Sequence, residues 1–124
     1  MNWQGVFPAV TTKFHQDGSL DMNMFFKNLD AQLDAGVHGI ILGGTLGESS
    51  VLSLEEKIQL TTETVKYING KVPVILNIAE GATRDAIFWA EKAKEMGASG
   101  LMLLPPMRNA ADHREVETYF KSVA

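Results

Sequence analysis

Apolar residues follow two alternating patterns along the chain, a helical spacing and then a short continuous run. Between Met22 and Leu33 they recur every three or four positions, and the run 39–42 comes next. The same order occurs twice more, with helical positions in 54–68 and 87–96 and runs in 72–76 and 101–104. Spacing near 3.6 residues indicates helices, whereas short apolar runs bounded by turn residues are typical of buried strands.

Sequence signals at the ends of these segments support the pattern. A glycine follows each of the three helical stretches, at Gly36, Gly70 and Gly97, where a left-handed residue commonly ends a helix. The segments 53–56 (SLEE) and 112–115 (DHRE) resemble capping boxes, and the second predicts a last helix with its apolar face at 116–123. With a first strand expected at 6–11 and a turn at Asp17-Gly18, the chain is predicted to contain four strands and four helices in alternation.

Strands that alternate with helices predict a parallel sheet, because a parallel connection needs a crossover that a helix supplies. Ligands of such sheets bind beyond the carboxyl ends of the strands. Four segments lie at those ends: 11–13, 43–50, 77–81 and 105–109.

Composition narrows the classes of function. The 124 residues match one domain, 1–124, with no separate second domain expected. A net charge of −4 argues against nucleic acid or an anionic membrane as a partner. The absence of cysteine excludes disulfides and thiol catalysis, and the sequence has no run of 18 apolar residues. A soluble, cytoplasmic protein is therefore the expectation.

The richest candidate site is the loop 43–50, with the sequence GGTLGESS, between a predicted strand and a capped helix. Glycines let backbone N–H groups approach a ligand closely, so the loop could cradle a carboxylate or a phosphate. It does not match a P-loop, because Glu48 stands where the phosphate-binding lysine would follow Gly47. A tight connection without a ligand explains the same residues equally well.

Other polar residues near the predicted ligand edge carry weaker signals. Lys13 could form a Schiff base if it were buried, but nothing around it in the sequence indicates burial. Glu48 and Glu80 are interpreted as structural carboxylates more readily than as general bases. The three histidines have no partner at metal-ligand spacing, and no metal site is predicted. Met107 differs from the other methionines in lying on the ligand edge.

Three segments together resemble the dihydrodipicolinate synthase and N-acetylneuraminate lyase family of Schiff-base lyases. They are 5–12 (GVFPAVTT) with 17–21 (DGSLD), 44–49 (GTLGES) with 52–57 (LSLEEK), and 70–75 (GKVPVI). The resemblance covers the whole chain and implies a TIM (β/α)8 barrel, of which this chain would be about the first four βα units. It also implies an imine between a sixth-strand lysine and pyruvate or another 2-keto acid.

The resemblance assigns roles to matching positions. Thr45 is expected to bind the substrate carboxylate and to act in a catalytic proton relay, with the N–H of Leu46 as a further donor. Gly44 and Met107 would also contact substrate, while Gly47 and Glu48 would shape the loop. No cofactor is expected, and the partners would be a small 2-keto acid and further copies of the chain in a dimer or tetramer.

Two departures from the family pattern bear on the reaction. The second threonine of the family loop is Leu46 here. Met107 stands where the synthase proper has a tyrosine that takes part in the proton relay. Because methionine cannot relay a proton, the chain looks more like the branch that acts on 2-keto-3-deoxy sugar acids or hydroxyproline-derived substrates by dehydration, deamination or cleavage. The imine lysine and a fifth-strand tyrosine belong to segments beyond Ala124, so the chain alone is expected to be inactive.

Two other classes of function remain open for this sequence. One is a non-catalytic half-barrel that associates with a copy of itself, because four parallel strands leave unpaired edges. The other is a small α/β module that binds an anion at the loop 43–50.

Overall fold

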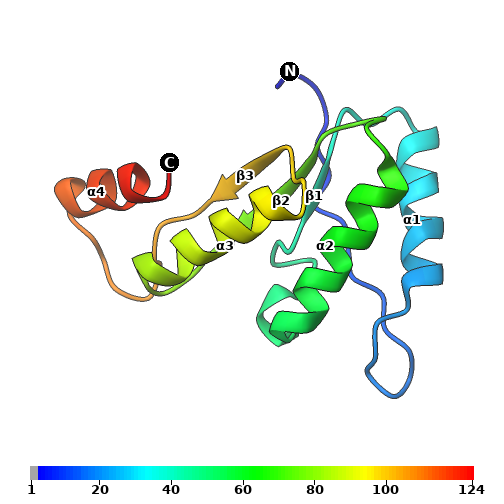
Figure 1. Cartoon of the computed structure of the whole chain (residues 1–124), viewed down its shortest axis with the longest axis horizontal. Helices are drawn as coiled ribbons and strands as arrows, with labels where there is room; N and C mark the ends of the chain where they lie inside the picture. The colour runs from blue at the N-terminus through cyan, green and yellow to red at the C-terminus, as the bar shows by residue number, and fades with distance from the viewer. Residues whose placement is uncertain (1–2) are drawn as a thin grey trace.

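The computed structural model describes residues 3–124. Over these residues, four α-helices alternate with three β-strands (Figure 1). The elements are α1 (Met22–Asp34), β1 (Ile40–Leu42), the 3₁₀ turn η1 (Ser49–Val51), α2 (Leu54–Ile68), β2 (Val74–Ile78), α3 (Thr83–Glu95), β3 (Gly100–Leu103) and α4 (His113–Val123).

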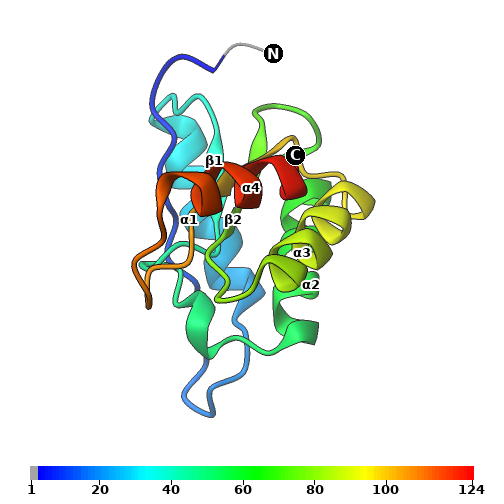
Figure 2. The ribbon, with the colours of Figure 1, turned by 90° about the vertical axis from the view of Figure 1, so that its left-hand side faces the viewer.

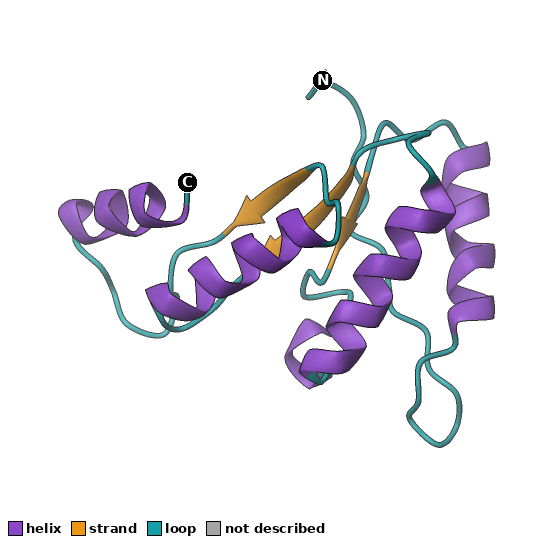
Figure 3. Cartoon of the chain, in the orientation of Figure 1, coloured by secondary structure: helices purple, strands orange, loops and turns teal. Residues whose placement is uncertain are grey.

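The three strands form one parallel sheet in the order β1-β2-β3 (Figure 3). Ile41 pairs with Ile75, and Ile75 pairs with Gly100 on its other side, so β2 is the central strand. The parallel sheet predicted from the alternation of helices and strands is therefore confirmed. All three carboxyl ends reach the same edge of the sheet, which brings the loops after β1 and β2 together.

The prediction of a first strand at 6–11 is wrong in its extent. Only Ala9 pairs with β1, as an isolated parallel bridge to Ile41, although the Val10 N–H also donates to the Ile41 carbonyl at 3.1 Å. Pro8 has no N–H, so it accepts a bond from Ile41 but cannot donate one, and a regular ladder does not form. Pro73 has the same effect on β2, which begins at Val74 rather than at residue 72.

The helix ends confirm the local signals in the sequence. Both capping boxes form: Ser53 and Glu56 exchange hydrogen bonds at the start of α2, and Asp112 and Glu115 do so at the start of α4. The glycines after α1, α2 and α3 all have positive φ, between 76° and 82°. Residues close in sequence therefore set the start of α2 and α4 and the end of α1, α2 and α3.

The core lies between the sheet and the helices. Helices α2 and α3 pack on β2, α1 packs on α2, and α4 contacts α3 beyond β3 (Figure 2). Fully buried apolar side chains come from α1, β1, α2 and β2: Phe25, Leu29, Ile40, Leu42, Ile68 and Ile78. Over residues 3–124, no helix has both the length and the hydropathy needed to cross a membrane.

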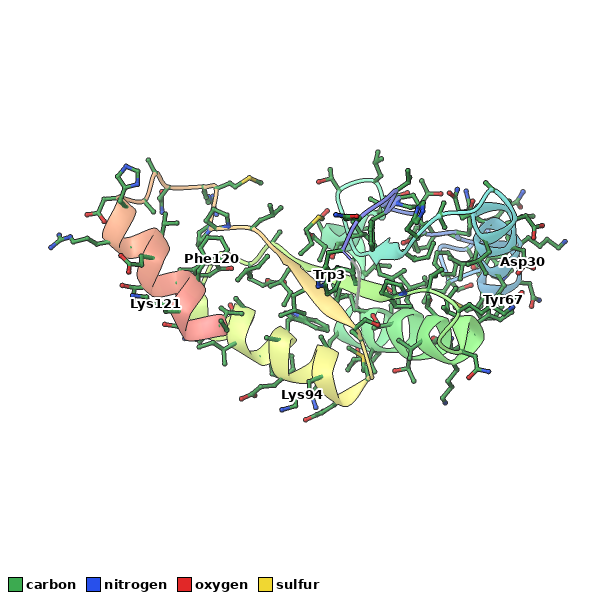
Figure 4. The ribbon with its side chains drawn as sticks, turned by 90° about the horizontal axis from the view of Figure 1, so that it is seen from above. Trp3, Asp30, Tyr67, Lys94, Phe120 and Lys121 are labelled. Atoms are coloured by element: carbon green, nitrogen blue, oxygen red, sulfur yellow. The ribbon has the colours of Figure 1, made fainter. Side chains whose placement is uncertain are left out.

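The edge of the sheet formed by β3 is less covered than its centre. Leu101 in β3 is 38% exposed, whereas the β2 side chains are mostly buried. Trp3 lies over this strand, where a Cβ at Gly100 would come within 2.6 Å of the indole ring (Figure 4). The sheet is therefore finished on the β1 side by the bridge to Ala9 and remains partly open along β3.

Candidate functional site

The loop 43–48 leaves β1 and enters η1 through two overlapping turns. The N–H of Gly47 donates to the Gly44 carbonyl at 3.0 Å, and the N–H of Glu48 donates to the Thr45 carbonyl at 3.1 Å. Gly43 has φ 68° and Glu48 has φ 55°, so a left-handed residue stands at each end. The loop is an ordered structure and not merely a flexible connection between two elements.

Two adjacent exposed residues of this loop have free backbone donors. The N–H groups of Thr45 and Leu46 form no hydrogen bond with any residue in 3–124, and neither does the Thr45 hydroxyl. Thr45 is exposed and Leu46 is 67% exposed, so this part of the loop lies at the surface of the chain. Adjacent free N–H groups in a tight turn attract an anion such as a carboxylate or a phosphate.

Two side chains from outside the loop hold its carbonyl groups. The Thr12 hydroxyl donates to the Gly47 carbonyl at 2.5 Å, and the Asn77 side-chain amide donates to the Gly43 carbonyl at 2.9 Å. Thr12 follows the bridge at Ala9, and Asn77 lies near the carboxyl end of β2. The loop is thus fixed to the segments on both sides of β1.

Gly47 is the most crowded position of the loop. A Cβ placed there would lie 3.2 Å from the Val10 carbonyl oxygen, and 3.3 Å from both the Gly43 nitrogen and the Gly44 oxygen. All three neighbours are backbone atoms, which cannot move aside as a side chain can. The close approach of the loop to residue 10 therefore requires glycine here.

A hollow of about 450 Å³ lies beside the loop. It is lined by Gly43, Gly44, Thr45, Ser49, Ser50, Lys57, Asn77, Ala79 and Glu80. Lys57 brings one positive charge from α2, and its Nζ lies 5.2 Å from the centre of the Trp89 ring. The hollow therefore combines hydroxyl donors, one cation and the carboxylate of Glu80, a lining that suits a small polar ligand.

A second and larger hollow, of about 630 Å³, lies between the β3 exit and α4. Pro105, Pro106 and Tyr119 are among its lining residues, and the Tyr119 hydroxyl donates to the Leu104 carbonyl at 2.9 Å. Burial, with a smaller contribution from the charge of Glu80, raises the pKa of Tyr119 above its ordinary value. The tyrosine is thus kept protonated, in the form that holds α4 to the end of β3.

The structure brings together only some of the residues singled out in the sequence. Gly44 and Thr45 line the hollow beside the loop, whereas Leu46, Gly47 and Glu48 are not among its lining residues. Met107 is 78% exposed and lines neither hollow. The expectation that it contacts substrate therefore has no support from its position in this chain.

Other candidates from the sequence lie apart from the loop or form no site within the described residues. The Lys13 backbone carbonyl accepts a bond from the Asp21 N–H at 2.8 Å, and its side chain lines none of the hollows described. Over residues 3–124, no three His, Asp or Glu side chains are grouped closely enough to hold a metal ion. Sequence reasoning did not assign roles to Thr12, Asn77 and Lys57. The only signal for the first two was their place after a strand.

A parallel sheet covered by helices, with a glycine-rich loop at the carboxyl ends of its strands, is the architecture of a segment of a (β/α)8 barrel. The chain belongs to the dihydrodipicolinate synthetase family, whose model matches residues 2–124. The resemblance noted in the sequence and the predicted fold class are therefore confirmed.

Relatives in sequence and in structure agree with this assignment. The 4-hydroxy-tetrahydrodipicolinate synthase of Bacillus subtilis is 37% identical over 124 residues, which are 100% of this chain and 43% of that protein. A dihydrodipicolinate synthase from Bacillus anthracis superposes with a TM-score of 0.95 at 30% identity, covering 99% of this chain and 42% of the other. The chloride-inhibited dihydrodipicolinate synthase from Acinetobacter baumannii, solved with pyruvate, gives 0.94 at 30% identity, covering 98% and 42%. The chain thus spans less than half the length of these relatives.

Proposed function

We propose that the loop 43–48 binds the carboxylate of pyruvate or a related 2-keto acid in a Schiff-base lyase. The observation that carries this proposal is the pair of free N–H groups at Thr45 and Leu46, beside the free Thr45 hydroxyl. A carboxylate has two oxygens with several lone pairs, so it can accept from two adjacent amides and a hydroxyl at once. Pyruvate is the ligand in the related Acinetobacter baumannii structure.

In this proposal, Thr45 has two roles, because its hydroxyl both contacts the carboxylate and passes a proton during the reaction. Leu46 contributes its N–H, Gly44 allows close approach, and Gly47 and Glu48 set the shape of the loop. Met107 contacts substrate only where another copy of the chain or a further segment brings it near the loop. The lysine that forms the imine comes from outside these 124 residues, and the working enzyme is a homo-oligomer.

Borohydride trapping with pyruvate tests this function. The protein as encoded in its genome should gain one reduced pyruvate adduct by mass spectrometry, whereas a peptide of residues 1–124 should gain none. An imine is formed when the lysine amine attacks the keto carbon and water leaves, and borohydride then reduces the C=N bond. An adduct on the 124-residue peptide would overturn the assignment and would direct attention to Lys13.

Variants of Thr45 separate carboxylate binding from the rest of the chemistry. Thr45→Val keeps the shape of the side chain but removes the hydroxyl, and it should slow trapping by about 10²-fold or more. Thr45→Ser keeps the hydroxyl and should recover most of the rate. Equal trapping by the valine variant and the unchanged protein would remove Thr45 from the mechanism.

The two departures from the family loop support a finer proposal about substrate. Leu46 removes one hydroxyl from the carboxylate site, and Met107 cannot relay a proton. We expect turnover of 2-keto-3-deoxy sugar acids to exceed condensation of pyruvate with an aldehyde of the lysine pathway. Comparison of kcat/KM for the two reactions in the encoded protein tests this, and a faster condensation would contradict it.

The open edge along β3 favours a second candidate function, a non-catalytic half-barrel that associates with its own copy. Leu101 is 38% exposed on this edge strand, and an unpaired strand is a template for another chain. Sedimentation of the encoded protein, combined with the trapping assay, distinguishes the two functions. A self-associating protein that forms no pyruvate adduct would support the half-barrel and contradict the lyase.

A further inference from the structure

The carbonyl groups of the loop 43–48 are almost all occupied by donors from within the chain. Those of Gly44 and Thr45 accept from the two turns, and that of Glu48 accepts from the Val51 N–H at 3.0 Å. The carbonyls of Gly43 and Gly47 accept long-range hydrogen bonds, from the Asn77 side-chain amide and the Thr12 hydroxyl. These two hydrogen bonds are called the ties below. Most of the loop's carbonyl groups are therefore engaged with the protein, while the N–H groups of Thr45 and Leu46 remain free.

We propose that Thr12 and Asn77 are positioning residues of the anion-binding loop, which hold its Thr45 and Leu46 N–H groups toward the ligand. This inference rests on the proposed function for its ligand, but the ties themselves do not depend on it. Each tie fixes a carbonyl at one end of the loop. If a carbonyl were released, its peptide group could rotate, and the neighbouring N–H groups would lose their common direction.

The Thr12 tie is buried and therefore costly to lose. The Thr12 side chain is 5% exposed, and its hydroxyl reaches the carbonyl of the crowded residue Gly47. A buried carbonyl without a donor is destabilised, because water cannot replace the lost bond. Thr12 thus supports the loop at the point where it packs against the segment before α1.

The orientation of the Asn77 side chain follows from its partner. The Gly43 carbonyl can only accept, so the Asn77 nitrogen must face it, and the amide oxygen points the opposite way. That oxygen is buried and has no partner in the described chain. An aspartate at this position would place a negative oxygen against the Gly43 carbonyl, so Asn77→Asp should repel the loop rather than hold it.

Thr12→Val is the main test, because it removes the hydroxyl with little change in shape. In the encoded protein, we expect the pyruvate concentration for half-maximal borohydride trapping to rise about tenfold, as expected when one buried carbonyl loses its donor. The maximal trapping rate should change much less, because the loop binds the carboxylate before and during the reaction alike. Thr12→Ser keeps the hydroxyl and should restore the original value.

Thr64→Val is the matched control. Thr64 is also buried, at 0% exposure, and its hydroxyl donates to the Leu60 carbonyl at 2.6 Å, but it lies in α2 away from the loop. Its loss should leave the half-maximal pyruvate concentration unchanged. If the two valine variants weaken pyruvate binding equally, the effect of Thr12 is general destabilisation and the inference is wrong.

Hydrogen exchange without ligand gives an independent measurement. The N–H groups of Gly47 and Glu48 are bonded inside the loop, so their exchange reports whether the loop keeps its turns. Exchange should accelerate about tenfold in Thr12→Val and in Asn77→Asp, but not in Thr64→Val. If Thr12→Val does not fold, Asn77→Asp carries the same test from the other end of the loop.

The two measurements distinguish failure of this inference from failure of the proposed function. Unchanged exchange at Gly47 and Glu48 in both variants would overturn the inference, whatever happens with pyruvate. Faster exchange in a protein that never traps pyruvate would support the ties and overturn the proposed function. Faster exchange together with weaker pyruvate binding would support both.

Discussion

Substitution of Gly47 by alanine tests whether the tight packing of the loop is needed for stability and binding. The new methyl group would meet only backbone atoms, with the Val10 oxygen nearest at 3.2 Å. A normal carbon to oxygen contact requires these neighbours to retreat by a few tenths of an ångström. That retreat must separate the loop from the segment at residue 10, or open the turn between Gly44 and Gly47.

The expected cost follows from two opposing effects. Overpacking a tight site costs about 1–3 kcal/mol. Alanine also restricts the unfolded chain, which returns about 0.4–1 kcal/mol where the native backbone accepts it, and Gly47 is not among the positive-φ glycines. The net loss should be about 1–2 kcal/mol, a five- to thirtyfold change in the ratio of folded to unfolded protein.

Urea unfolding of the encoded protein measures this loss, and borohydride trapping measures pyruvate binding in the same samples. Gly81→Ala is the matched control, because Gly81 lies in a loop at the same edge and a Cβ there meets no described atom within 4 Å. The control should be neutral or slightly more stable. If Gly47→Ala behaves like Gly81→Ala in both assays, the loop is looser than its contacts indicate and the reasoning fails.

Two further predictions concern stability away from the loop. Tyr67 donates to both carboxylate oxygens of Asp30 at 2.8 and 2.9 Å (Figure 4), and this hydrogen bond raises the pKa of Tyr67 above 10.0. This interaction stabilises the protein fully below the unfolded pKa of 10.0 and is lost as the pH rises through the higher folded pKa, so Tyr67→Phe should flatten the fall of the urea midpoint above about pH 10; an unchanged slope would contradict this. Ser53→Ala removes the cap of α2 and should lower the free energy of unfolding by about 1 kcal/mol, again by urea titration, whereas no loss would show that Glu56 caps the helix without it.

The sequence predicted those parts of the fold that depend on neighbouring residues. A capping box needs residues three apart, and a glycine cap needs only the absence of a Cβ, so both were visible in the pattern and are confirmed. The first strand failed because Pro8 limits the ladder that its apolar neighbours suggest. The hydrophobic pattern indicates which positions are buried, but a strand also needs a backbone N–H donor at every second position to pair with its neighbour.

The sequence likewise predicted the candidate site only in part. Glycines after a strand indicated the loop, but which of its N–H groups stay free depends on the turns that the loop adopts. Thr12 and Asn77 reach it across 35 and 34 residues, and no local pattern marks a threonine or an asparagine for such a contact. The large exposure of Met107 likewise depends on where the segment after β3 runs.

The location of these ties bears on how binding and chemistry are divided within the barrel. The loop 43–48 is held by a residue that precedes it and by one from the next strand, so its free N–H groups depend on contacts among residues 9–77. The net charge of −4 gives no general attraction for an anion, which leaves the local dipoles, the Thr45 hydroxyl and the charge of Lys57 to supply it. An imine lysine, by contrast, contributes nothing to these ties. Capture of a carboxylate should therefore survive replacement of that lysine, while imine formation should not.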